Sequence, residues 1–122
     1  LEEGARPRAI GAAIADIADG VTLRLIGLAQ ESLGAAPVAY AWLAAGSQGR
    51  RELTAGSDQD NAMVLADDFD EARDGAYFRE LSAFVCDGLH VCGYIHCPGL
   101  MMASTDRWRR PLAVWHDYFR GW

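Results

Sequence analysis

The sequence predicts an α+β fold in which a small mixed sheet is flanked by helices. Apolar residues recur at helical spacing near both ends of the chain, and two short apolar runs separated by a polar loop lie between them. Of the 122 residues, 51% are hydrophobic and 23% are charged, as in ordinary globular proteins. We therefore expect a single domain, 1–122, with a helical segment over 1–36 and a core over 37–122.

The first helix is expected from about residue 10 to Leu33, where Gly34 and Pro37 close it. Its apolar face is predicted to consist of Ile10, Ile14, Ile17, Val21, Leu25 and Leu28. The runs VAYAWLAAG (38–46) and NAMVLAD (61–67) are short, apolar and followed by turn residues, which predicts two buried strands.

An acidic connection, 67–75, leads into a second helix that we expect from residue 72 to about 89. Its apolar face is predicted to consist of Tyr77, Leu81, Phe84, Val85 and Leu89. Residues 98–104 (PGLMMAS) predict a third strand. The last helix is expected to carry an apolar stripe of Trp108, Leu112, Trp115, Phe119 and Trp122. Pro111 leaves the start of this helix open, because proline fits only its first turn.

Charge and composition exclude several classes of protein. The net charge of −6 is opposite in sign to that of a protein that binds nucleic acid through its phosphates. No apolar run approaches the roughly 20 residues of a membrane-spanning helix, and no signal peptide is visible. The three cysteines form no disulfide framework, so a reducing, cytoplasmic location is expected.

The polar chemistry is concentrated between the two predicted strands. Gly46 and Ser47 follow the first strand, and backbone N–H groups with a serine hydroxyl can cradle a phosphate. Arg50 carries a guanidinium group that suits phosphate oxygens. Asp58 and Asp60 would point the same way from an extended chain, and two such carboxylates favour a Mg²⁺ ion between them. Together these groups indicate phosphoryl or nucleotidyl transfer.

The order of these motifs resembles a known superfamily. An apolar residue, Gly46-Ser47, ten intervening residues and Asp58-x-Asp60 are similar to the signature of the DNA polymerase β-like nucleotidyltransferases. The fuller stretches GSQGRRELTAGSDQDNAMV and HCPGLMMASTDRW resemble one branch of that superfamily, over about residues 38 to 115. This branch comprises signal-transduction nucleotidyltransferases found behind CBS or cyclic-nucleotide-binding domains and related to bacterial uridylyltransferases of the PII protein.

The resemblance implies a nucleotidyltransferase fold with residues 37–122 as its catalytic core. Gly46 and Ser47 would hold the phosphates of a nucleoside triphosphate, with Arg50 beside them. Asp58 and Asp60 would bind two Mg²⁺ ions. The expected reaction moves a nucleoside monophosphate to a protein or small-molecule acceptor, and the parent chain is expected to carry the regulatory domains.

Some features depart from the superfamily pattern. Gln59 and Asn61 stand where the superfamily prefers apolar residues, although DQDN is usual in the branch. The superfamily also needs a third carboxylate, and residues 91–104 contain none. We expect it on a strand beyond Trp122, which would make this chain a fragment truncated at its C-terminus, with weak or absent catalysis. The alternative function is therefore a catalytically inactive nucleotide-binding regulatory module.

Two other clusters admit different interpretations. His90, Cys92, His96 and Cys97 are zinc-ligand types, but their spacing lacks a paired C-x₂-C knuckle and packing explains them better. The tryptophan stripe of the last helix could be core, or it could dock a neighbouring domain or form a homodimer.

Overall fold

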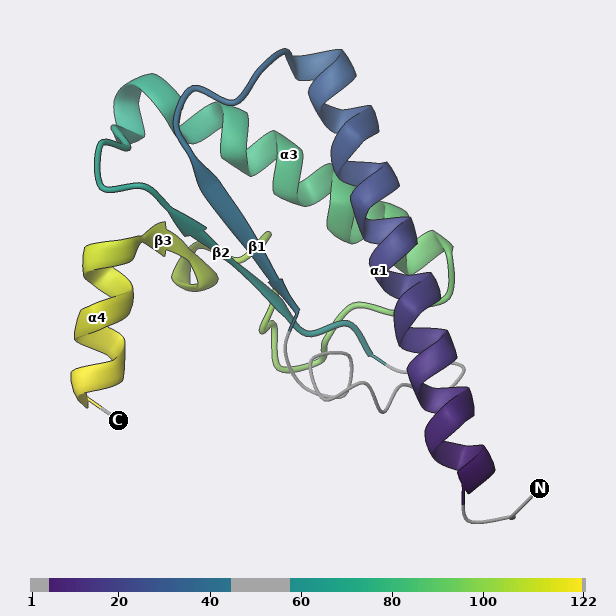
Figure 1. Ribbon diagram of the computed structural model, residues 1–122. Coiled ribbons are helices and arrows are strands. Elements are labelled where there is room, and N and C mark those ends of the chain that lie inside the picture. Colours follow the sequence, from purple (N-terminus) through teal and green to yellow (C-terminus); the bar gives the residue numbers. More distant parts are fainter. Residues whose placement is uncertain (1–4, 45–57, 122) are drawn as a thin grey trace.

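The computed structural model describes residues 5–44 and 58–121, with side chains from residue 9 onward, and it confirms the α+β class (Figure 1). The elements in chain order are α1 (Ala5–Leu33), β1 (Tyr40–Ala44), β2 (Asn61–Leu65), α3 (Glu71–Val91), a 3₁₀ turn (Asp106–Trp108), β3 (Arg109–Pro111) and α4 (Leu112–Gly121). Within the described ranges, no helix combines the length and apolar content needed to cross a bilayer.

The three strands form a mixed sheet in the order β1-β2-β3. β1 and β2 are antiparallel, with Tyr40 opposite Leu65 and Ala44 opposite Asn61. β2 and β3 are parallel, with Met63 opposite Arg109. The helical crossover through α3 explains this arrangement, because parallel neighbours need a long connection whereas antiparallel ones do not.

The predicted strand over 98–104 is wrong. This segment turns instead: the backbone N–H of Leu100 donates to the carbonyl of Cys97 at 2.9 Å, and Leu100 has φ of 58°. A left-handed residue interrupts an extended strand. The third strand is Arg109–Pro111, where the last helix was expected to begin.

The core lies on the face of the sheet that α3 covers. Met63 and Leu65 of β2 are buried there, and the helix contributes Phe78, Leu81, Val85, Cys86 and Leu89. The prediction for Phe84 is wrong, because this side chain is 46% exposed. Phe78 takes its place and makes an edge contact with Tyr40, with ring centroids 5.5 Å apart.

α1 packs against α3. As expected, the helix ends at Leu33 and Gly34 follows it. Gly34 has φ of 87°, and its N–H donates to the carbonyl of Gln30 at 2.8 Å, which is a left-handed helix cap. The predicted apolar face is only partly buried, since Ile10 and Ile17 are 58% and 60% exposed. Alanines are buried instead, because their small side chains allow close approach; they are Ala15, Ala18 and Ala29.

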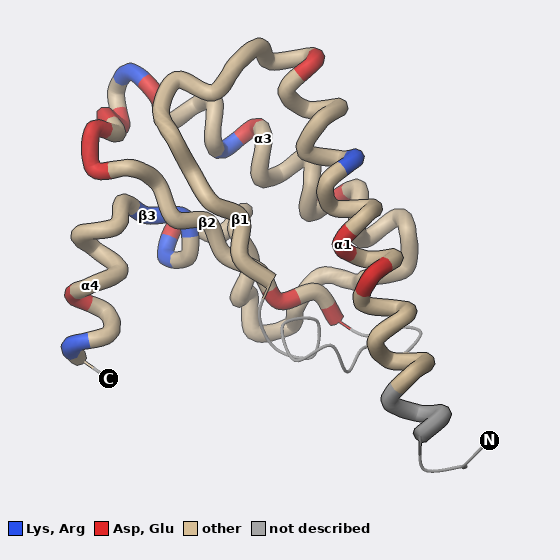
Figure 2. Tube along the Cα trace, viewed as in Figure 1, with Lys and Arg blue, Asp and Glu red and all other residues tan. Residues whose placement is uncertain are grey.

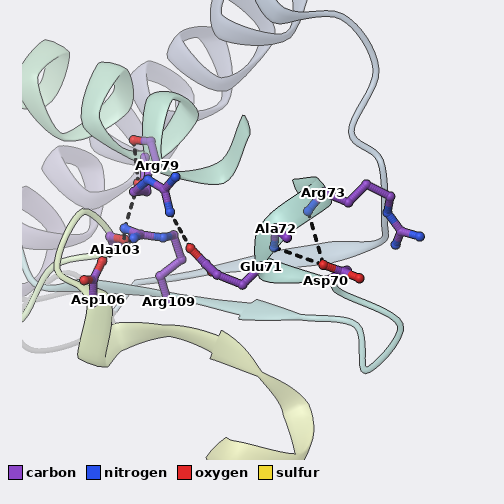
Figure 3. Close-up of polar contacts among 9 residues, drawn as sticks. Asp70, Glu71, Ala72, Arg73, Arg79, Ala103, Asp106 and Arg109 are labelled. Carbon is purple, nitrogen blue, oxygen red and sulfur yellow. Dashed lines mark hydrogen bonds and ion pairs between the residues drawn. The ribbon is translucent and has the colours of Figure 1, made fainter. Parts of the chain in front are cut away.

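The N-terminus of α3 is capped by an acidic residue. The carboxylate of Asp70 accepts the backbone N–H groups of Ala72 and Arg73 at 2.9 and 3.2 Å (Figure 3). Asp74 is buried and accepts a hydrogen bond of 2.8 Å from the Arg73 guanidinium and one of 3.0 Å from the N–H of Asp70. The guanidinium is the main cause of a lowered pKa for the Asp74 carboxyl.

Arg109 joins β3 to α3. The parallel register places it on the core side of the sheet beside Met63, and its guanidinium donates to Ser82 Oγ at 3.3 Å and to the carbonyl of Ala103 at 3.0 Å. Asp106 pairs with the same guanidinium (Figure 3). This pairing allows a charged residue to be buried in the third strand.

α4 begins directly after Pro111 and packs beside β2 and β3. The Asp67 carboxylate accepts the N–H of Ala113 at 2.9 Å, and the Trp115 indole donates to the carbonyl of Met63 at 3.3 Å. The predicted stripe is only partly correct: Trp115 is buried, but Phe119 is 62% exposed and Trp108 precedes the helix. Trp122 lies outside the described residues.

Candidate functional site

Two of the predicted site residues are described, and they lie at the end of the sheet where β1 stops and β2 starts. Gly46, Ser47 and Arg50 fall within 45–57, outside the described residues. Asp58 and Asp60 are described and precede Asn61, the first residue of β2. Because Asn61 lies opposite Ala44, β1 ends and β2 begins at the same end of the sheet (Figure 1).

Burial alternates along the segment that carries the two aspartates. Gln59 and Asn61 are 2% and 1% exposed, whereas Asp58 and Asp60 are half-buried. This is the pattern of an extended chain with period two, in which alternate residues share a side. Gln59 and Asn61 point into the core, and an extended chain favours the opposite direction for the two carboxylates.

Gln59 ties the segment to α3 and to the chain that follows it. Its amide nitrogen donates to the carbonyl of Cys86 at 2.8 Å and to that of Tyr94 at 3.0 Å. Its backbone N–H donates to the carbonyl of Ile95 at 2.8 Å. Three hydrogen bonds therefore hold the residue between the two aspartates.

Asn61 continues this network. Its amide nitrogen donates to Oε1 of Gln59 at 2.9 Å, and its Oδ1 accepts the backbone N–H of Ala103 at 2.7 Å. The Cys86 thiol lies 3.5 Å from the same oxygen, and burial raises the pKa of that thiol, so it remains a neutral donor. Both ends of each amide are satisfied, which makes a buried polar network stabilising and specific.

Gln59 and Asn61 are the residues whose importance the sequence pattern concealed. Both residues depart from the apolar preference of the superfamily, yet their buried amide hydrogen bonds fix the chain on either side of Asp60. The signal was present in the alternation itself: if Asp58 and Asp60 face away from the core, their neighbours must face into it. Which groups would receive the two amides could not be deduced from local sequence.

Comparison with known protein families identifies the family of the chain. Residues 1–122, the whole chain, match the family described as "Putative nucleotidyltransferase DUF294". The chain belongs to this family. The comparisons with curated proteins and with solved structures gave no significant match. Family membership supports nucleotidyl transfer in general, and the α+β arrangement is consistent with a nucleotidyltransferase domain.

The DUF294 chain presents a ligand set that fits Mg²⁺. This ion takes oxygen ligands and is commonly bound by one or two carboxylates together with substrate phosphates and water. Asp58 and Asp60 supply two carboxylates on one side of the chain. Over residues 5–44 and 58–121, no third acidic, histidine or cysteine side chain joins them in a cluster.

In this member of the family, acidic residues lie before and after β2. Asp58 and Asp60 precede the strand, whereas Asp67, Asp68 and Asp70 follow it, so the two acidic groups lie at opposite ends of the sheet (Figure 2). The second group has structural roles, because Asp67 and Asp70 bind the N-termini of α4 and α3.

The histidine and cysteine cluster lies near the surface and is not buried in the core. The rings of His90 and His96 stack with centroids 4.2 Å apart, and Nδ1 of His90 accepts the backbone N–H of His96 at 3.0 Å. Nε2 of His96 lies 3.2 Å from Asp87. Cys92 is exposed, and the part of the chain that the structure describes contains no set of three ligands able to share a metal.

Proposed function

We propose that this protein transfers a nucleoside monophosphate from a nucleoside triphosphate to a protein or small-molecule acceptor, with Mg²⁺ and in a signalling context. The proposal is supported by the pair Asp58 and Asp60, two half-buried carboxylates whose neighbours Gln59 and Asn61 are fixed by buried amide hydrogen bonds. The proposal also rests on membership of the DUF294 family.

Each residue has an assigned part in this reaction. Asp58 and Asp60 would hold the metal, with two ions as the expected number, and Gly46, Ser47 and Arg50 would bind the triphosphate. Bound Mg²⁺ would neutralise charge on the attacking and leaving oxygens. An acceptor hydroxyl oxygen forms a bond to the α-phosphorus, the bond to pyrophosphate breaks, and the hydroxyl proton is released.

The setting of the reaction is also part of the proposal. CBS or cyclic-nucleotide-binding domains in a longer parent chain would regulate the transfer, and the chain could act as a homodimer in the cytoplasm. The net charge of −6 favours a protein or small molecule over a nucleic acid as acceptor.

A second candidate is a regulatory module that binds the nucleotide without turnover. It is favoured by one observation: within the described residues, no further carboxylate accompanies Asp58 and Asp60. A third carboxylate would serve as general base or shared metal ligand, so its lack would leave binding intact and abolish transfer.

Calorimetric titration and a transfer assay would separate these candidates. ATP, GTP, CTP and UTP are titrated with and without Mg²⁺ into the chain and into an Asp58→Asn/Asp60→Asn variant. We expect Mg²⁺-dependent binding of at least one nucleotide, weakened at least tenfold in the variant. Asp68→Asn, an exposed carboxylate at the opposite end of the sheet, is the matched control and should bind normally.

Release of pyrophosphate on the same samples then distinguishes enzyme from module. Turnover that the double variant abolishes supports the transferase, and binding without turnover supports the regulatory module. Binding that is equally strong in the double variant would contradict both.

A further inference from the structure

The outer edge of β1 presents unpaired backbone groups. In the antiparallel ladder, Ala39 and Ala66 form a hydrogen-bonded pair, with 2.9 Å between the N of Ala66 and the O of Ala39. Bonded and non-bonded pairs alternate, so Ala41 and Leu43 bond to β2 whereas Tyr40, Trp42 and Ala44 direct their N–H and C=O groups outward. Among the described residues, no strand pairs with this edge.

A groove runs along the same edge. It has a volume of about 270 Å³ and lies between α1 and β1, lined by Asp19, Thr22, Leu23, Ile26, Trp42 and Ala44. The two β1 residues in this lining, Trp42 and Ala44, are among those whose backbone groups point outward. Leu23 is 70% exposed, so the groove opens to solvent at its apolar wall.

The described strand β1 lacks three common protections against pairing. Natural edge strands commonly carry a charged residue, a proline or a bulge. The strand Tyr40–Ala44 reads YAWLA, and it pairs with β2 in continuous register over all five residues. Three of the five residues, Ala41, Leu43 and Ala44, are exposed. Such an edge can accept an extended chain by strand addition.

We propose that an extended segment of a protein acceptor binds along the free edge of β1 and places one large apolar side chain in the groove. Alternate side chains of an added strand would enter the groove beside Trp42 and lie on the opposite face beside Leu43. Asp19 and the net charge of −6 disfavour acidic residues in this segment. That the segment is the acceptor rests on the proposed function.

The location is suited to delivering an acceptor. Ala44, at the end of the groove, lies opposite Asn61, which follows Asp60 directly. With a rise of about 3.4 Å per residue, the three residues from Met63, which lies opposite Trp42, to Asp60 span about 10 Å along the strand. A segment bound along β1 would therefore end beside the two aspartates.

A second copy of this chain fits the groove less well. Pairing two β1 strands would require Tyr40 or Trp42 of the second copy to enter the groove, but both side chains pack against the core of their own chain. The Tyr40 hydroxyl also accepts a hydrogen bond of 2.8 Å from Gln30. A foreign segment has no such constraint.

Selection from a phage-displayed library of random twelve-residue peptides tests the inference. The chain is the target, and the selected peptides are synthesised and titrated. Amide hydrogen exchange, read by NMR, should show at least tenfold slower exchange at Trp42 and Ala44 with peptide bound. The peptides should share one large apolar residue and lack acidic ones.

Three variants locate the contact. Leu23→Glu, in the groove wall, and Ala44→Pro, which removes an outward N–H without removing a bond to β2, should each weaken peptide binding at least tenfold. Ile17→Glu changes another exposed residue of α1, which lies outside the groove lining, and should leave peptide binding unchanged.

Failure to select any peptide, or protection elsewhere than β1, would overturn the inference. Protection of these amides that grows with protein concentration without peptide would assign the edge to a second copy instead. Mg²⁺-dependent nucleotide binding is measured on the same unmodified chain: its absence would overturn the proposed function, whereas the peptide results decide the docking site.

Discussion

Asn61 uses both ends of its amide inside the fold. One end donates to Gln59, and the other accepts from Ala103. Because Asn61 directly follows Asp60, any movement of this amide is transmitted to the carboxylate beside it. Asn61 would therefore position the Asp60 carboxylate, which is proposed to bind the metal, without contacting the metal or the nucleotide itself.

Replacing Asn61 with leucine tests this role. Asn61→Leu leaves the Ala103 N–H and the Gln59 oxygen buried without their partner, at a cost of about 1–3 kcal/mol for each group. We expect a lower free energy of unfolding in urea and Mg²⁺-dependent nucleotide affinity at least tenfold weaker under conditions where the variant is folded.

Leu81→Ala is the matched control for stability alone. This core residue is fully buried in α3, and its truncation costs about 2–5 kcal/mol. If the folded Leu81→Ala protein loses nucleotide affinity as strongly as Asn61→Leu, the effect reflects general destabilisation and not positioning.

At the scale of single elements, α3 is defined at its start by two acidic residues. Asp70 caps the first turn, and Asp74 is buried against the Arg73 guanidinium. Negative charge near a helix N-terminus is favourable because the backbone N–H groups there lack partners within the helix. The acidic connection, 67–75, therefore organises the start of the helix that carries the core.

The lowered pKa of Asp74 predicts a pH dependence of stability. Its carboxyl has a lower pKa in the folded chain than in the unfolded one, so its stabilising contribution is present above its ordinary pKa of 3.8. The contribution is lost as pH falls through the lowered value. Urea unfolding between pH 7 and pH 2.5 should show this decline.

The Asp74→Asn variant identifies the group responsible. It should be less stable than the natural chain at pH 7, and the difference between the two should shrink at low pH. Asp68→Asn alters an exposed carboxylate in the same acidic segment and should retain the full decline. An undiminished stability difference at the lowest pH would show that Asp74 does not act through its charge.

At the scale of the whole molecule, each helix occupies a different position relative to the sheet. α3 covers the core face of the sheet, and α1 packs against α3, whereas α4 lies beside β2 and β3 (Figure 1). Within the described residues, α4 is attached through the cap from Asp67, the indole of Trp115 and the hydroxyl of Tyr118, which donates to the carbonyl of Arg107 at 3.0 Å.

Trp115 is expected to dominate the attachment of α4. Trp115→Ala removes a side chain that is 4% exposed together with its hydrogen bond to Met63, and should cost about 3–5 kcal/mol of unfolding free energy. Leu112→Ala, on the same helix but 46% exposed, should change it by about 0.5 kcal/mol or less. Equal losses in urea unfolding would contradict this assignment.

Local pattern was sufficient for much of this chain. Helical spacing and the Gly34 stop signal predicted α1, and two apolar runs predicted β1 and β2. The alternation around Asp58 and Asp60 indicated that both carboxylates share a side. These features depend on backbone geometry that repeats every two or 3.6 residues, so neighbouring residues report them directly.

Tertiary structure decided which residues of other elements each helix and strand contacts. Phe78 replaced Phe84 in the core because the rotation of α3 is set by its contacts with β2 and α1. The third strand formed at Arg109–Pro111, where a charged residue finds Ser82, Ala103 and Asp106. Periodicity cannot reveal such partners, because Ser82 comes from a distant helix and the turn before β3 brings Ala103 and Asp106 to the same guanidinium. The sequence by itself predicted that Asp58 and Asp60 carry the chemistry, and long-range packing decided how their neighbours Gln59 and Asn61 are held.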